Sequence, residues 1–205
     1  AALAALLAAV PASAATLPSF EAALLSARQA VLHTQADQMK AKDARVLSEL
    51  QQLGRDVQDL SWKAQELRTN VQEVRTRAEQ PRPAPRPGTP SQPDPNLRWD
   101  VQRLNWDVQD YANRVQDSLR TLQNLQREVA KDPSYVAPAQ QLANAASDLR
   151  SQQNWLQSDA QWAAMDLRQA GFSFEAMDLE QRVDDADRAA NDIDTGARTL
   201  LGQVR

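Results

Sequence analysis

An unbroken heptad repeat of apolar residues runs through the N-terminal part of the chain. Every seventh position from 25 to 74 is apolar, and these positions are Leu25, Leu32, Met39, Val46, Leu53, Leu60, Leu67 and Val74. A second series, offset by three residues, reads Ala22, Gln29, Ala36, Asp43, Leu50, Val57, Ala64, Val71 and Ala78. Two series that alternate at intervals of four and three form the a/d seam of a coiled coil. We therefore predict one long coiled-coil helix over residues 16–80.

The seam is weakest near its N-terminal end. Gln29 and Asp43 occupy seam positions there, and residues 39–44 read MKAKDA. Polar residues at seam positions weaken a coiled coil. A break at 39–44, which would give two helices, is therefore the alternative. If the C-terminal half of the long helix joins the bundle formed by the rest of the chain, residues 19–45 would remain as an arm or a segment for self-association.

Proline separates this helix from the rest of the chain. Residues 81–95 read PRPAPRPGTPSQPDP. Proline lacks an N–H and disfavours α-helix in the residue before it, so we predict an extended linker. The PxxP spacings that link Pro87, Pro90 and Pro93 would also suit an SH3-type domain. We favour the linker, because the first residues of the chain, AALAALLAAV, predict export from a bacterium, where SH3-type domains are few.

Three further helices with the same heptad spacing are predicted over residues 96–205. Asn96 and Ser173 are suitable N-caps, Pro138 suits a first helical turn, and Gly171 suits a helix C-terminus. Short connections favour antiparallel neighbours. The predicted fold is therefore all-α: a long heptad-patterned helix, a Pro-rich linker and an antiparallel three-helix coiled-coil bundle. The C-terminal half of the long helix is a candidate fourth member.

The first residues resemble a signal peptide. An apolar run, AALAALLAAV, precedes Pro11 and the small residues Ala12 and Ala14, which matches cleavage after Ala14 or Ala15. The run is shorter than the roughly 20 residues that span a bilayer. The alternative is an Ala-rich first helix. Arginine far outnumbers lysine in the chain, which is typical of a GC-rich genome and, together with the signal peptide, indicates a bacterial protein. We predict a signal peptide at residues 1–15, clipped at its start, and a mature bacterial protein that is periplasmic or secreted and has no integral membrane span.

Several functional classes are disfavoured by what the chain lacks. With no cysteine, it has no disulfide, iron–sulfur cluster or thiol nucleophile. The single histidine, His33, argues against multi-histidine metal sites and a Ser-His-Asp triad. A net charge of -4 argues against nucleic-acid binding. We expect no enzymatic activity, no cofactor and no metal site.

An acidic cluster in the last predicted helix invites comparison with a calcium site. Its members are Asp184, Asp185, Asp187, Asp192 and Asp194. A calcium loop of the EF-hand type needs oxygen ligands at alternate positions and a glycine at the sixth. The cluster lacks that spacing, and a continuous heptad pattern runs through it. We therefore predict a solvated helix face.

All five tryptophans lie away from the predicted seams, which makes them candidate partner-binding residues. They are Trp62, Trp99, Trp106, Trp155 and Trp162. The first three occupy heptad position f, nearly opposite the seam, and the last two occupy position c. They either pack between helices of a larger bundle or form an exposed aromatic band. Such a band would bind a protein partner, a glycan or an unfolded chain.

These features predict a non-enzymatic structural or adaptor protein of the bacterial cell envelope. Its partners would be other proteins, or a second copy in a homo-oligomer, bound through the heptad seams. The alternative is a periplasmic holdase-like chaperone that binds unfolded clients through helical, Trp-bearing faces. Binding to a lipid surface is less favoured, because the polar helix faces are mixed in charge rather than rich in Lys and Arg.

Overall fold

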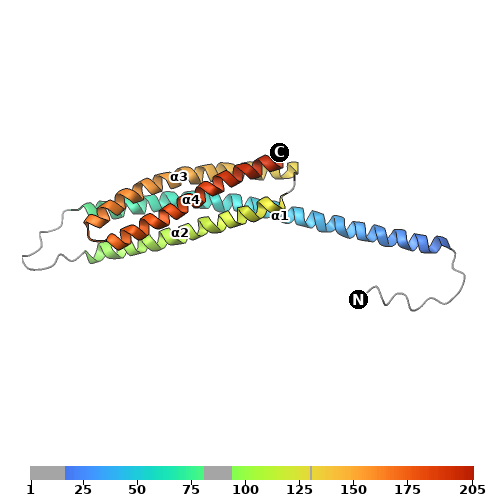
Figure 1. Ribbon diagram of the computed structural model, residues 1–205, viewed down its shortest axis with the longest axis horizontal. Coiled ribbons are helices and arrows are strands. Elements are labelled where there is room, and N and C mark those ends of the chain that lie inside the picture. Colours follow the sequence, from blue (N-terminus) through green and yellow to red (C-terminus); the bar gives the residue numbers. More distant parts are fainter. Residues whose placement is uncertain (1–16, 81–93, 130) are drawn as a thin grey trace, which may run out of the picture. The chain divides into compact units, whose positions relative to one another are not determined.

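Four long helices account for most of the chain. The computed structural model describes residues 17–80, 94–129 and 131–205. Its elements are α1 (Leu17–Glu79), α2 (Pro95–Glu128), the short 3-10 helix η1 (Pro133–Tyr135), α3 (Val136–Gln169) and α4 (Ser173–Val204) (Figure 1). No strand occurs in these ranges, so the all-α prediction is confirmed. The predicted signal peptide and the Pro-rich linker up to residue 93 lie outside the described residues.

The chain divides into two compact units at Ala44 and Arg45. Within the first unit, α1 passes through residues 39–44 without a break. The side chains of its described seam residues, such as Leu25, Leu32 and Met39, are exposed. The heptad pattern therefore continues in this unit without a buried seam.

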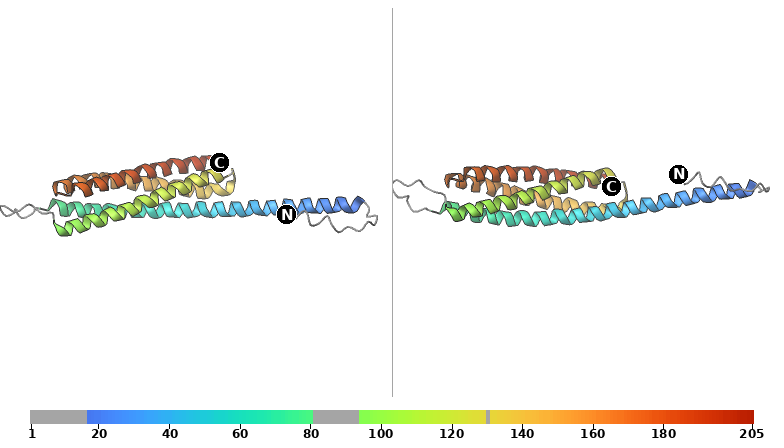
Figure 2. Two further views of the ribbon diagram at one scale, coloured as in Figure 1. Left: turned by 60° about the horizontal axis from the view of Figure 1, so that its bottom comes forward. Right: turned by 90° about the horizontal axis from the view of Figure 1, so that it is seen from below.

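The second unit, Arg45–Arg205, is a four-helix bundle, and the part of α1 from Arg45 onward is its fourth member (Figure 2). The seam residues that heptad spacing identifies are buried here. Those contributed by α1 are Val46, Leu50, Leu53, Val57, Leu60, Ala64, Leu67, Val71 and Val74. The seams of α3 and α4 are rich in alanine, which leaves room for the two helices to approach closely.

The short connections predict the neighbouring helices only in part, because α3 and α4 pack side by side but α2 and α3 do not. Helix α4 packs against both α2 and α3. Helix α1 reaches α2 through an ion pair between Arg77 and Asp100, and α3 through one between Arg68 and Asp159. Helices α2 and α3 therefore occupy diagonal corners of the bundle and are not the predicted side-by-side neighbours. The connection between Glu128 and Val136 is long enough to cross the end of the bundle, at about 3.3 Å per residue.

The start of α2 differs from the prediction by two residues. Asp94, rather than Asn96, is the N-cap, and its side chain accepts a hydrogen bond from the Asn96 N–H at 2.9 Å. Pro95 is the first helical residue, where its missing N–H costs nothing. The cap and the proline together fix the point at which α2 begins.

Gly171 ends α3 as predicted, with a φ of 88° that favours glycine. The N–H of Phe172 donates to the Leu167 carbonyl at 2.9 Å, and that of Gly171 to the Arg168 carbonyl at 3.1 Å. This is the Schellman arrangement, and the buried Phe172 ring completes it. Phe172 also precedes α4, so the predicted cap Ser173 is instead the first residue of that helix.

A polar layer crosses the apolar core of the bundle. The Tyr111 hydroxyl donates to Oε1 of Gln153 at 2.8 Å, and Nε2 of Gln153 donates to the Val183 carbonyl at 3.0 Å. Both side chains are 0% exposed. Burial, reinforced by the charge of Asp187, raises the pKa of Tyr111 well above its usual range, so its hydroxyl keeps its proton. The layer ties α2, α3 and α4 into one register.

One member of the acidic cluster lies in the core. Asp194 is 1% exposed, and it accepts hydrogen bonds from Arg150 of α3 at 3.1 Å and from Arg198 of α4 at 3.0 Å. The prediction of a solvated face is therefore wrong for Asp194, because two arginines compensate its buried charge. Within the described residues, no group of three acidic, histidine or cysteine side chains is placed to hold a metal ion.

The polar layer can be tested by removing its two partners separately and together. We expect Tyr111→Phe to lower the free energy of unfolding by about 1–2 kcal/mol, because it leaves a buried acceptor unsatisfied. We expect Gln153→Leu to cost about 1–3 kcal/mol by leaving the hydroxyl unpaired. The free energy of unfolding of the double variant should fall by less than the sum of the two single losses. Urea denaturation measures all three, and strictly additive losses would show that the hydrogen bond does not couple the helices.

Two glycines offer a matched test of helix packing. An added Cβ at Gly54 would lie 3.9 Å from the Leu142 backbone nitrogen, which is ordinary contact, whereas one at Gly196 would lie 2.9 Å from Cδ2 of Leu122. Gly54→Ala should therefore raise the free energy of unfolding by about 0.5–1 kcal/mol. Gly196→Ala should not raise the free energy of unfolding, because its added methyl group would be too close to the Leu122 side chain. Equal stabilisation in thermal melts would contradict the close packing of α2 on α4.

Candidate functional site

All five tryptophans are exposed on the second unit. The exposed fractions are 66% for Trp62, 69% for Trp99, 69% for Trp106, 56% for Trp155 and 51% for Trp162. Of the two arrangements that the sequence allows, the structure therefore has the exposed one. Five large aromatic side chains in water are unusual for a surface that contacts nothing, so these residues form the candidate site.

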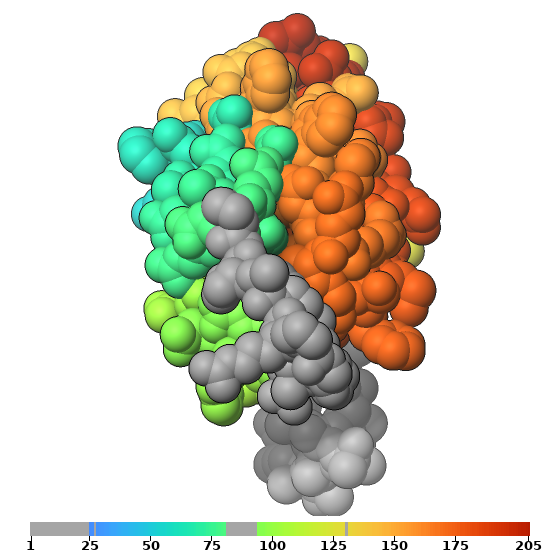
Figure 3. Space-filling view, turned by 90° about the vertical axis from the view of Figure 1, so that its left-hand side faces the viewer, coloured from blue at the N-terminus to red at the C-terminus, as the bar shows by residue number. Residues whose placement is uncertain are grey.

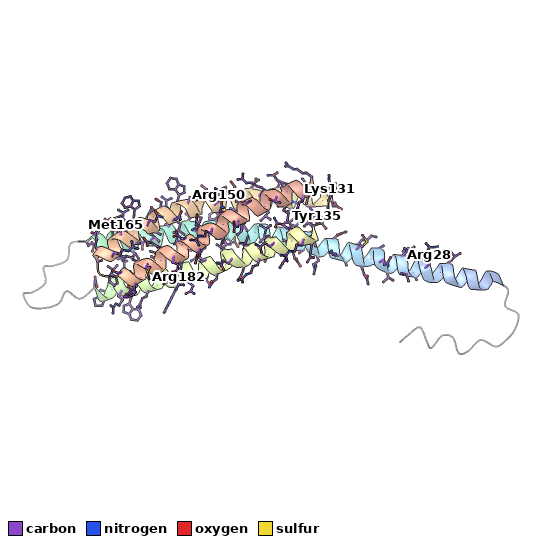
Figure 4. The ribbon with its side chains drawn as sticks, viewed as in Figure 1. Arg28, Lys131, Tyr135, Arg150, Met165 and Arg182 are labelled. Carbon is purple, nitrogen blue, oxygen red and sulfur yellow. The ribbon has the colours of Figure 1, made fainter. Side chains whose placement is uncertain are left out.

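The exposed apolar side chains cluster along the bundle. All of the large ones in the described part of this unit lie between its middle and the end formed by the α3–α4 turn. Besides the tryptophans they are Met165, Phe174 and Met177, and Figure 4 labels Met165 near that end. Figure 3 looks onto this end, where α1, α2 and α3 meet. Sequence analysis missed all three of these residues, although Met165 lies off the heptad seam of α3 and Phe174 and Met177 lie off that of α4.

One aromatic pair is organised by arginines from α1. The guanidinium of Arg68 lies over the Trp155 ring, with Cζ 5.2 Å from the ring centroid. Its Nε donates to Oδ2 of Asp159 at 2.6 Å, and Nε2 of Gln72 donates to the same oxygen at 2.8 Å. A cation over an aromatic face is attracted by the ring quadrupole. The tryptophan, the arginine and the aspartate therefore hold each other in place.

The same arrangement recurs one heptad further along. Arg75 lies 5.7 Å from the centroid of the Trp162 ring, and its Nε donates to Oδ2 of Asp166 at 2.9 Å. This hydrogen bond, with the charge of Glu79, raises the pKa of Arg75 above its usual value. Both arginine–aspartate pairs join residues 91 positions apart. Helices α1 and α3 therefore run parallel in one register.

The outer surface of α3 around these rings is nearly free of charge. Residues 151–165 include one charged residue, Asp159, and it is already bound to α1. The exposed polar side chains there carry hydroxyl or amide groups, and they are Ser151, Asn154, Ser158 and Gln161. Further along the same α1–α3 groove lies a shallow hollow of about 360 Å³. Its polar lining residues are Gln51, Gln58, Gln141, Asn144 and one charged residue, Arg55.

The other aromatic pair lies on a different face. Trp99 and Trp106 occupy outward positions of α2, which is diagonal to α3. The adjoining hollow between α1 and α2 has about 300 Å³ and is lined mainly by charged side chains, among them Glu73, Arg77, Asp100, Arg103 and Asp107. We refer to these two surfaces as the α3 face (Trp155, Trp162) and the α2 face (Trp99, Trp106). They present similar rings in different electrostatic surroundings.

The remaining observations add no competing site. His33 is exposed in the first unit. Among the helices of residues 17–80, 94–129 and 131–205, none has an apolar stretch long enough to cross a membrane. No protein-family model, curated protein or solved structure matches this chain. The argument for function therefore rests on the two aromatic faces.

Tryptophan fluorescence tests the exposure directly. In variants that retain a single tryptophan, we expect emission at solvent-exposed wavelengths and quenching by acrylamide for each of the five. Trp99 should be quenched more strongly than Trp155, because Arg68 covers one face of the Trp155 ring. Arg68→Met should make the quenching of Trp155 more similar to that of Trp99, because it removes the guanidinium that covers the Trp155 ring. Blue-shifted emission that resists the quencher would show that the rings are buried.

Proposed function

We propose that this protein is an exported, non-enzymatic adaptor of the bacterial cell envelope, which binds two partners on separate faces of one rigid bundle. The observation that carries the proposal is the pair of exposed tryptophans on each of two diagonal helices. Tryptophan is enriched among the residues that contribute most to binding. Two such faces that point in different directions suit a protein that joins envelope components.

The rigidity of the bundle supports this role. Each aromatic pair spans seven residues of a helix whose inner face is fully buried, so little order has to be gained on binding. The Arg68–Asp159 and Arg75–Asp166 pairs further restrain the rings of the α3 face. Export is predicted from residues 1–15. The absence of an enzymatic role is predicted from a sequence with no cysteine and one histidine.

A periplasmic holdase-like chaperone is the second candidate. It is favoured by the exposed Met165, Phe174 and Met177, which extend the apolar surface beyond the tryptophans. Flexible methionine side chains suit binding to varied apolar sequences. The adaptor is preferred because the aromatic pairs lie on separate faces.

Photo-crosslinking in the native envelope distinguishes the two. A benzophenone amino acid would replace Trp99 or Trp155, with the exposed Gln123, at the other end of α2, as the matched control. The adaptor proposal predicts a discrete set of adducts from each tryptophan position, different for the two faces, and none from position 123. A broad set of unfolded clients shared by both faces, with suppressed client aggregation, would favour the holdase. No adduct at either face would contradict both.

A further inference from the structure

We propose that the α3 face binds an extended, uncharged polysaccharide of β-1,4-linked pyranose rings, with sugar rings stacked on Trp155 and Trp162. This inference rests on the adaptor function proposed above, and it names the ligand class of one of the two faces. Three properties of the α3 face support it: the spacing of its rings, the scarcity of charge on the outer side of α3 and its supply of amide and hydroxyl groups.

The spacing of the rings fits a linear glycan. Trp155 and Trp162 are seven residues apart on one helix, which places them about 10.5 Å apart along nearly the same line. A β-1,4-linked chain in its extended form repeats every two sugars over a similar length. Alternate sugars of such a chain can therefore lie over successive tryptophans. The C–H groups on the flat side of a pyranose ring pack well against the electron-rich face of an indole.

The electrostatics favour a neutral ligand. Arg68 and Arg75 lie beside the two rings, but each is hydrogen-bonded to an aspartate of α3. Their charge is therefore compensated within the protein and offers little attraction to an anionic polymer. Asp159, the one acid within residues 151–165, is compensated in the same way. Arg75 also pairs with Glu79 of α1 at 2.9 Å. The uncharged surface is therefore the outer side of α3 itself, whose exposed polar side chains between residues 151 and 165 carry only hydroxyl or amide groups.

The polar groups of the face suit sugar hydroxyls. Asn154, Ser158 and Gln161 are exposed beside the rings and can donate and accept hydrogen bonds. Gln141 lies two heptads before Trp155 on the same line of α3, within the hollow between α1 and α3, whose lining also includes Arg55. A glycan that lies along this groove would reach the hollow about 21 Å from Trp155. The face therefore offers contacts to several consecutive sugars.

The α2 face provides the matched control. Trp99 and Trp106 have the same seven-residue spacing, so they offer a similar pair of rings. Asp100, Arg103 and Asp107 lie in the hollow beside them, where an uncharged chain would have to desolvate charged groups. A preference for a neutral glycan should therefore separate the α3 face from the α2 face, although both contain two exposed tryptophans.

Binding to defined polysaccharides tests the inference. The full chain would be sedimented with microcrystalline cellulose and with chitin, and titrated with a soluble hexamer of β-1,4-linked N-acetylglucosamine. We expect binding to at least one of these probes and none to amylose, whose α-linked chain is curved. Trp155→Ala/Trp162→Ala should weaken binding by about tenfold or more, whereas Trp99→Ala/Trp106→Ala should change it less than about twofold.

A second pair of variants separates recognition from folding. Trp155→Phe/Trp162→Phe retains flat rings and should recover much of the affinity lost in the alanine pair, while circular dichroism and thermal melting confirm an intact bundle. Lack of binding to every β-1,4-linked probe, or equal losses from the two faces, would overturn the inference. If crosslinking from Trp155 then still captured a discrete protein, the adaptor proposal would stand with a protein ligand on this face.

Discussion

The hydrogen bond between Tyr111 and Gln153 fixes the register on which the surface of the bundle depends. Apolar seams alone allow helices to slide by a heptad at modest cost, since one layer of alanine and leucine resembles the next. A buried amide and hydroxyl that satisfy each other do not allow this, because a slip would leave both unpaired in the core. The position of α3 is thereby set.

The surface features follow from that register. With α3 held in place, Asp159 and Asp166 lie opposite Arg68 and Arg75 of α1, one heptad apart. The same arginines then cover one side of each tryptophan ring and leave the rest exposed. These ion pairs are only partly buried, so each contributes modestly to stability by itself. Their effect is to orient the rings and to pair the charges around them, which leaves the α3 face aromatic and polar with few unpaired charges.

Heptad spacing predicted much of this fold, and its failures have physical causes. The seams of all four helices are buried in the bundle, as the spacing requires, and the tryptophans lie off them. The pattern specifies which side of a helix is buried but not which neighbour covers it, so the diagonal placement of α2 and α3 could not be predicted. Asp194 lies beside the seam residue Ile193, and its buried charge is compensated by Arg198 of α4 and by Arg150 of α3. The partner from α3 could not be predicted from the heptad spacing of α4. Whether an off-seam tryptophan is exposed depends on how many helices surround it, which heptad spacing does not specify.

The most direct test of the account is whether the two aromatic faces are separate. The chain has no cysteine, so introduced pairs can be cross-linked without interference. In the folded protein, a short bismaleimide should join Arg68→Cys to Asp159→Cys rapidly, because α1 and α3 are neighbours. It should not join Trp106→Cys to Trp162→Cys, because those positions face outward from diagonal helices. Efficient cross-linking of the second pair, or failure of the first, would contradict two separate binding faces.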